Sequence, residues 1–215
     1  MSWHVQHVQD RNTPVVYTLI GDFFVKDLKF TNCFVQSVSE LDSARLYNMA
    51  QKSEFLLKDY KAIAIHVGIN NALSVCDPEE FARDIQKAIE IIRNVNPSAV
   101  ILLSSILFAP SLSDSQHISR QLLNHKLDLV ANQNRGVVFC TSYHCLDPKK
   151  KKKRRRYSST YEGIQNALKI RKLQMNHDFY SDDGLHLSSL GVNQLQSYFV
   201  GCLSQSRQYR YQLSL

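Results

Sequence analysis

The sequence lacks the long apolar runs that a membrane-spanning helix requires. No stretch reaches the roughly 18 consecutive apolar residues of such a helix. The N-terminus, Met-Ser-Trp-His-Val-Gln-His, also lacks the positive stretch and following apolar stretch that mark a secretory signal. With 44% hydrophobic and 21% charged residues, the chain can bury a core of ordinary size. We therefore expect one globular domain, located in the cytoplasm or the nucleus, with no membrane partner.

Cysteines spaced as in common metal sites are absent too. The five cysteines include no Cys-x-x-Cys pair, and an odd number does not suit a framework of disulfides. Cys140 and Cys145 flank His144, but this spacing matches no common zinc pattern, so a zinc site here is only the weaker alternative. Reduced thiols are the better interpretation. We expect no metal site and no cofactor.

Positive charge is scarce outside one segment. The chain has a formal net charge of +7, yet eight consecutive cations account for more than all of it, which leaves −1 for the rest. These cations are Lys149, Lys150, Lys151, Lys152, Lys153, Arg154, Arg155 and Arg156, called the basic tract below. The basicity therefore belongs to one local tract and not to the surface of the fold.

Alternating strand and helix patterns indicate an α/β domain. Short apolar runs predict buried strands at 15–20, 61–67, 99–103 and 136–140, and runs of this kind suit a parallel sheet covered on both faces. Helical spacing predicts helices at about 38–57, 77–96, 118–131 and 190–203. The fold class expected is a three-layer α/β/α sandwich with a mostly parallel central sheet. We expect a domain at 15–204, with tails at 1–14 and 205–215.

A long insertion is expected at about 146–180, because that part of the chain departs from the alternation. It holds the basic tract and a polar, helix-like piece at 165–173.

Three short strings stand where predicted strands end or the last helix begins. Gly21-Asp22 follows the first strand, Gly68-Ile69-Asn70-Asn71 follows the second, and Asp183-Gly184-Leu185-His186 precedes the final helix. In open α/β sheets, ligands bind outside the carboxyl ends of the strands. The order and placement of the strings resemble the SGNH (GDSL-type) hydrolases, over nearly the whole chain except the insertion and tails.

The resemblance implies a serine hydrolase site with some of its parts in place. His186 would be the general base, Asp183 would orient its imidazole, and Asn70 would donate to the oxyanion. Gly21, Asp22 and Gly68 would complete the family's strings at this site.

The chain departs from the family pattern at the decisive position. Phe23 stands where the family has its serine nucleophile, and Phe24 follows it. No glycine occurs between Gly21 and Gly68, although the family's second block supplies one to the oxyanion hole. The last residue of the third block is Asn71 and not aspartate. Because loss of a triad serine costs on the order of a million-fold in rate, we expect a catalytically impaired domain.

Other interpretations of these residues stay open. His186 and Asp183 can be a structural pair that closes a loop, and Asn70 can cap a turn. Phe23 and Phe24 can be core residues or a stacking surface. An atypical or weak esterase is the alternative function.

Further polar residues near strand ends have their own alternatives. Ser104 or Ser105 could replace the missing nucleophile, provided that one lies within reach of the base. His66 lies inside a strand, so packing is expected, and His177 is expected at the surface.

The basic tract fits a nucleic-acid-binding arm, a nuclear import signal or a solvated loop. Its cations could neutralise phosphates, and Tyr157 and Tyr161 could stack on unpaired bases. Serine-less SGNH-like domains resemble this chain and include the RNA-binding domain of the germ-plasm protein Oskar. Esterase domains of LINE-type retrotransposons are similar in the strings around Asn70 and His186. We therefore expect a binding module, for RNA or another nucleic acid or for a protein partner; the sequence does not indicate an oligomeric state.

Overall fold

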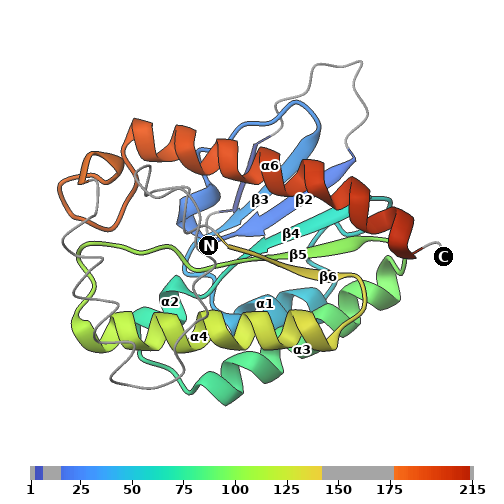
Figure 1. Cartoon of the computed structure of the whole chain (residues 1–215), viewed down its shortest axis with the longest axis horizontal. Helices are drawn as coiled ribbons and strands as arrows, with labels where there is room; N and C mark the ends of the chain where they lie inside the picture. Colours follow the sequence, from blue (N-terminus) through green and yellow to red (C-terminus); the bar gives the residue numbers. More distant parts are fainter. Residues whose placement is uncertain (1–2, 7–15, 142–176, 214–215) are drawn as a thin grey trace.

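The computed structural model describes residues 3–6, 16–141 and 177–213 (Figure 1). Six strands form one sheet in the order β1-β3-β2-β4-β5-β6. Strand β1 is antiparallel to β3, and the other neighbours are parallel. The strands are β1 (Trp3–Gln6), β2 (Tyr17–Gly21), β3 (Cys33–Val38), β4 (Ala62–His66), β5 (Val100–Ser104) and β6 (Val137–Cys140).

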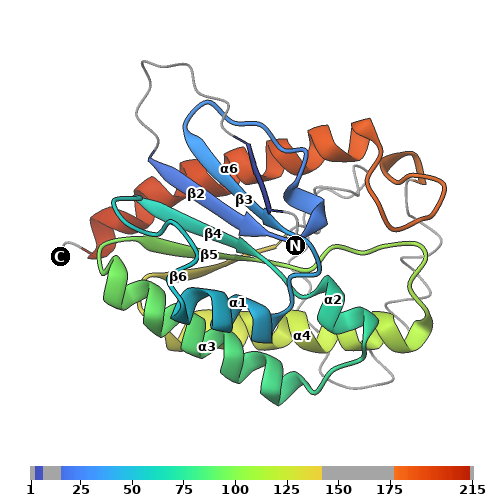
Figure 2. The same ribbon diagram turned by 180° about the vertical axis from the view of Figure 1, so that it is seen from behind.

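The helices lie on both faces of this sheet. They are α1 (Ser43–Gln51), α2 (Ile69–Leu73), α3 (Pro78–Val95), α4 (Asp114–Gln133) and α6 (Ser189–Leu213), with short 3₁₀ helices η1 (Phe23–Val25) and η2 (His177–Phe179). Helix α6 crosses one face, while α1, α3 and α4 cover the other (Figures 1 and 2). The expected three-layer α/β/α sandwich with a mostly parallel sheet is confirmed.

The four strands predicted from apolar runs are β2, β4, β5 and β6. Every residue of β2, β4 and β5 is buried, as expected for strands covered on both faces. Strand β3 was not predicted, because Gln36 and Ser37 interrupt its apolar run. The structure buries Gln36 by pairing its amide: Nε2 donates to Thr18 Oγ1 at 2.8 Å, and Oε1 accepts from the Leu56 N–H at 2.9 Å.

The predicted helices are present with shifted limits. Helix α3 begins as expected, with Asp77 accepting the N–H groups of Glu79 and Glu80 and with Pro78 in the first turn. Helix α4 begins at a capping box of Ser113 and Gln116. The helix expected at 38–57 is wrong in extent, because Val38 ends β3 and Asp42 caps α1.

Both expected tails contain secondary structure. Within 1–14, β1 pairs with β3, so backbone hydrogen bonds recruit a segment that has no long apolar run. Within 205–215, α6 continues to Leu213.

Part of the expected insertion lies outside the described residues. This applies to the basic tract, the piece at 165–173, and His144, Cys145, Tyr157 and Tyr161. Among the residues that the structure does describe, no helix is both long and apolar enough to cross a bilayer.

The strand order places a topological switch between β2 and β4. From β2 the chain moves outward to β3, then returns across β2 to β4 and continues in the opposite direction. At such a point the loops after the two central strands diverge to opposite faces and leave a crevice at the carboxyl edge of the sheet. The strings that begin at Gly21 and Gly68 follow these two strands.

Candidate functional site

The first two strings leave the sheet side by side. In the parallel pairing of β2 and β4, Gly21 lies opposite His66. A Cβ atom on Gly21 would lie 2.9 Å from the His66 carbonyl oxygen and 2.8 Å from the Val25 side chain. Glycine at this position therefore lets the chain turn sharply into η1 against the neighbouring strand.

Helix η1 carries two phenylalanines whose ring centroids lie 4.5 Å apart. Asp22 caps it by accepting the Phe24 N–H at 3.0 Å. The Phe24 side chain is buried, with its ring centroid 5.9 Å from that of His66. The Phe23 ring is half-buried, and its centroid lies 4.9 Å from that of the His186 imidazole. The structure thus joins the first string to the third through the contact of the Phe23 ring with the His186 imidazole.

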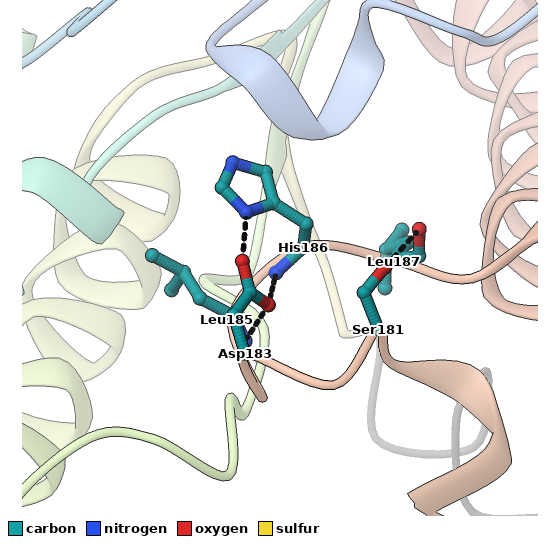
Figure 3. A network of polar contacts seen from close by, with 5 residues as sticks. All are labelled: Ser181, Asp183, Leu185, His186 and Leu187. Carbon is teal, nitrogen blue, oxygen red and sulfur yellow. Dashed lines mark hydrogen bonds and ion pairs between the residues drawn. The ribbon is translucent and has the colours of Figure 1, made fainter.

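Asp183 and His186 form a pre-arranged pair in the third string (Figure 3). One carboxylate oxygen of Asp183 accepts the N–H groups of Leu185 at 2.8 Å and His186 at 2.9 Å, while the other pairs with His186 Nδ1. The hydrogen bond from His186, supported by the two backbone N–H groups, lowers the pKa of Asp183 to about 2. Because Nδ1 is engaged, Nε2 is the nitrogen left to exchange a proton with a nucleophile. The imidazole side chain is 56% exposed.

The third string is held against the loop after β5. The Ser111 N–H donates to the Gly184 carbonyl at 3.1 Å, and the Tyr180 hydroxyl donates to the Phe108 carbonyl. The Ser181 N–H donates to the His186 carbonyl at 2.8 Å and closes the loop on itself. Hydrogen bonds to the loop after β5 and within the third string therefore fix the position of the Asp183–His186 pair.

The second string contributes Asn70 at the start of α2. Its Nδ2 donates to the Leu41 carbonyl at 3.0 Å, in the turn before α1. An amide nitrogen carries two hydrogens, so one such bond leaves the second hydrogen for another acceptor. Its role as an oxyanion donor therefore stays a prediction. The neighbouring Asn71 is buried and links the same regions, because its Oδ1 accepts the Ser43 N–H at 3.0 Å.

Gly68 is required by both conformation and space. Its φ is +118°, and an added Cβ would lie 2.5 Å from Ile106 Cδ1. We expect Gly68→Ala to lower the free energy of unfolding by about 2–3 kcal/mol, because strained backbone and overpacking each cost on the order of 1–3 kcal/mol. Urea unfolding of the two proteins measures this. Gly201→Ala is the matched control, since no heavy atom lies within 4 Å of a Cβ there. Equal losses in both variants would contradict the expectation.

The turn after β3 has an unusual backbone conformation at a residue other than glycine. Glu40 has a φ of +56°, a backbone region that usually favours glycine. The turn therefore keeps a conformation suited to glycine although the residue is glutamate. A search of the sequence for glycines could not find it.

Behind the site lies a buried polar chain that sequence reasoning missed. His66 Nδ1 is 3.0 Å from Ser104 Oγ, which is 3.3 Å from the Tyr198 hydroxyl. His66 is 1% exposed and Ser104 is 2% exposed. Burial lowers the pKa of His66 to about 4, so the imidazole is neutral at neutral pH. Packing of His66, which the sequence predicted, is confirmed.

The serines considered as substitute nucleophiles do not suit that role. The Ser104 hydroxyl contacts His66 and Tyr198, and Ser105 is also 2% exposed. An attacking hydroxyl must reach both the base and a substrate carbonyl. Burial keeps these two serines from an incoming ester.

Asp22 is fully buried at the start of η1. One of its oxygens accepts the Phe24 N–H, and the other has no hydrogen-bond partner. Burial, only partly offset by backbone hydrogen bonds, raises the pKa of Asp22 to about 7. This carboxyl supports η1 and is closed to solvent.

Comparison with known proteins gives the fold its name. No protein-family model and no curated protein matches the sequence. A solved structure from Streptococcus pneumoniae, named for platelet activating factor, has a TM-score of 0.67 at 17% identity, covering 88% of this chain and 84% of its own. A GDSL-like lipase from Bacteroides thetaiotaomicron has a TM-score of 0.61 at 13% identity, with 88% of each chain covered. The chain has the fold of the SGNH hydrolases.

A third SGNH-type structure agrees. A member of the lipolytic G-D-S-L family from Veillonella parvula has a TM-score of 0.61 at 12% identity, covering 88% of this chain and 98% of its own. Likeness at such identities concerns the fold, because one fold supports many functions. These structures therefore identify the fold of the chain and leave its activity open to the chemistry of the site.

In the described site, the Asp183 carboxylate pairs with the His186 imidazole, and the Phe23 ring lies against that imidazole. Among the described residues, no group of three or more His, Cys, Asp or Glu side chains is placed to hold a metal ion. The chemistry left to the described site is proton exchange at His186 and apolar contact at Phe23.

Proposed function

We propose that this chain is a non-catalytic SGNH-like domain that binds single-stranded RNA through its basic tract. The proposed lack of catalysis rests on the position of the Phe23 ring. Its centroid lies 4.9 Å from that of the His186 imidazole, where a catalytic hydroxyl would have to be. A phenyl ring has neither a lone pair to attack a carbonyl nor a proton to give to the base. We therefore expect the wild-type chain not to turn over esters.

The proposed binding of RNA rests on the sequence. Eight adjacent cations lie within a chain whose other residues have a net charge of −1, so attraction to phosphates is concentrated in one short segment. Each phosphate neutralised releases counterions, which makes such binding strong at low salt and steeply weaker as salt rises. Two tyrosines, Tyr157 and Tyr161, follow the tract and can stack on unpaired bases. This combination favours single strands over duplexes.

The tract is tested by charge removal in the full chain. We expect replacement of Lys151, Lys152 and Lys153 by glutamine to weaken binding of a single-stranded RNA by roughly tenfold to a hundredfold at low salt, because about three phosphate contacts are lost. The slope of log affinity against log salt should fall by about 2, since each contact contributes about 0.7 for single strands. Fluorescence anisotropy over a salt series measures both quantities.

A matched control removes equal charge elsewhere. Lys52, Lys58 and Lys61 are exposed on the described fold, and their replacement by glutamine makes the same change of net charge. This control should keep most of the affinity and the salt slope. If both triple variants lose affinity equally, binding follows overall charge and the tract is not the site.

An esterase of the SGNH type is the second candidate. The Asp183–His186 pair favours it, because the carboxylate and imidazole are held as a working triad would hold them. It predicts hydrolysis of an aryl acetate that disappears in His186→Ala. Absence of turnover above buffer in the wild-type chain would reject this candidate.

A further inference from the structure

A hollow of about 510 Å³ lies between the end of β6 and α6, away from the Asp183–His186 pair. Cys140, the last residue of β6, lines it from the sheet, and Cys202 lines it from the helix. The Tyr198 hydroxyl, one helical turn before Cys202, donates to the Cys140 carbonyl at 2.7 Å. This bond fixes the strand end against the helix, and with it the relative position of the two cysteines.

The two thiols also interact with one another. A side-chain interaction between them raises the pKa of Cys140 and lowers that of Cys202. A bond from Tyr198 further lowers the pKa of Cys202. Both cysteines are reduced in the structure. Cys202 is 8% exposed and Cys140 is half-buried, and both border the hollow through which a small reagent can approach.

We propose that Cys140 and Cys202 form a reversible redox pair that hydrogen peroxide converts to a disulfide. The Cys202 sulfur attacks one peroxide oxygen, the O–O bond breaks, and the product is a sulfenic acid with release of one water. The Cys140 sulfur then attacks the Cys202 sulfur, an S–S bond forms and a second water leaves. In total, two thiols and one peroxide give one disulfide and two waters.

The disulfide would enclose a large part of the chain. Residues 141–201 lie between the two cysteines, and they include the basic tract and the Asp183–His186 pair. A crosslink over such a long loop restricts the unfolded chain strongly. We therefore expect oxidation to raise the Tm by roughly 5–10 °C, and reduction by dithiothreitol to reverse the shift.

The test treats the full-length reduced chain with hydrogen peroxide and maps the products by mass spectrometry. The expected product has lost two hydrogen atoms and contains a peptide pair joined through Cys140 and Cys202. Cys202→Ser should abolish both this product and the Tm shift. Cys76→Ser, which changes a half-buried cysteine outside the hollow, is the matched control and should leave both unchanged.

Two outcomes would overturn the proposal. One is a disulfide between Cys140 and Cys145, which are close in sequence, and the variant Cys145→Ser shows whether the proposed bond forms without this competitor. The other is oxidation of single cysteines to sulfinic acid with no crosslink. A trivalent arsenical gives a check that needs no variant. Phenylarsine oxide should bind to Cys140 and Cys202 of the wild-type chain together. Both thiols should then be protected from a thiol alkylator that is added later. Alkylation of either cysteine after this treatment would contradict their pairing.

Discussion

Phe23→Ser should give this chain an aryl acetate hydrolase activity that depends on His186. The substitution removes the ring that faces the imidazole and puts a hydroxyl on η1, beside a base that Asp183 already orients. A complete triad contributes on the order of a million-fold in rate. Loss of one oxyanion donor costs on the order of 10²–10³. We therefore expect the rate of ester hydrolysis by Phe23→Ser to be roughly a thousandfold higher than that of a variant that only removes the ring.

That comparison is made with Phe23→Ala, which clears the same ring without supplying a nucleophile. Release of nitrophenol from its acetate ester is the measurement, and a burst equal to the enzyme concentration would reveal an acyl-enzyme. Phe23→Ser combined with His186→Ala should return the rate to that of Phe23→Ala. If the single variant is no faster than Phe23→Ala while its unfolding curve is unchanged, the donors that stabilise an oxyanion are no longer in place. Glu40, whose φ is positive, and Asn70, bonded to Leu41, are then the residues to examine.

The fold could be predicted where local pattern and burial agree. Strands β2, β4 and β5 are largely apolar because both of their faces are covered, so their apolar runs could be recognised in the sequence. Strand β3 is equally buried but carries Gln36, whose amide is satisfied by Thr18 and Leu56, far from it in sequence. Such pairing is a tertiary property, and no window of sequence around β3 reveals it.

The site divides in the same way. Gly21, Gly68, Asp183 and His186 could be found because each serves a backbone turn or a local hydrogen bond within its own string. The contact of Phe23 with His186 could be expected only through the family resemblance, since 162 residues separate them. The buried polar chain from His66 through Ser104 to Tyr198 has no local sequence signal. It forms because β4, β5 and α6, which are far apart in sequence, bury these polar groups against one another.

Asp22 and His66 should contribute to the free energy of unfolding with opposite dependence on pH. Burial raises the pKa of Asp22 from 3.8 to about 7, so the folded chain binds a proton there that the unfolded chain has released. This contribution is present below pH 4 and is lost as pH rises to about 7. Burial lowers the pKa of His66 from 6.5 to about 4, so its contribution is present above pH 6.5 and is lost as pH falls to about 4.

Each pKa unit corresponds to about 1.4 kcal/mol, so the two contributions amount to roughly 4 and 3 kcal/mol and largely cancel in the wild-type chain. Asp22→Asn keeps an acceptor for the Phe24 N–H but cannot ionise, so its unfolding free energy should rise by about 3 kcal/mol from pH 4 to pH 6.5. His66→Gln should show the reverse, a fall of about 4 kcal/mol from pH 4 to pH 7.

Urea unfolding at a series of pH values measures all of these curves, and the double variant should be nearly flat because both titrating groups are gone. Asp183 does not disturb the comparison, since its pKa of about 2 places its titration below this range. Curves for Asp22→Asn that run parallel to the wild type would mean that water or a neighbouring group reaches the buried carboxyl. The carboxyl that caps η1 would then be a solvated carboxylate, and a serine at position 23 would have a negative charge beside it that opposes an oxyanion.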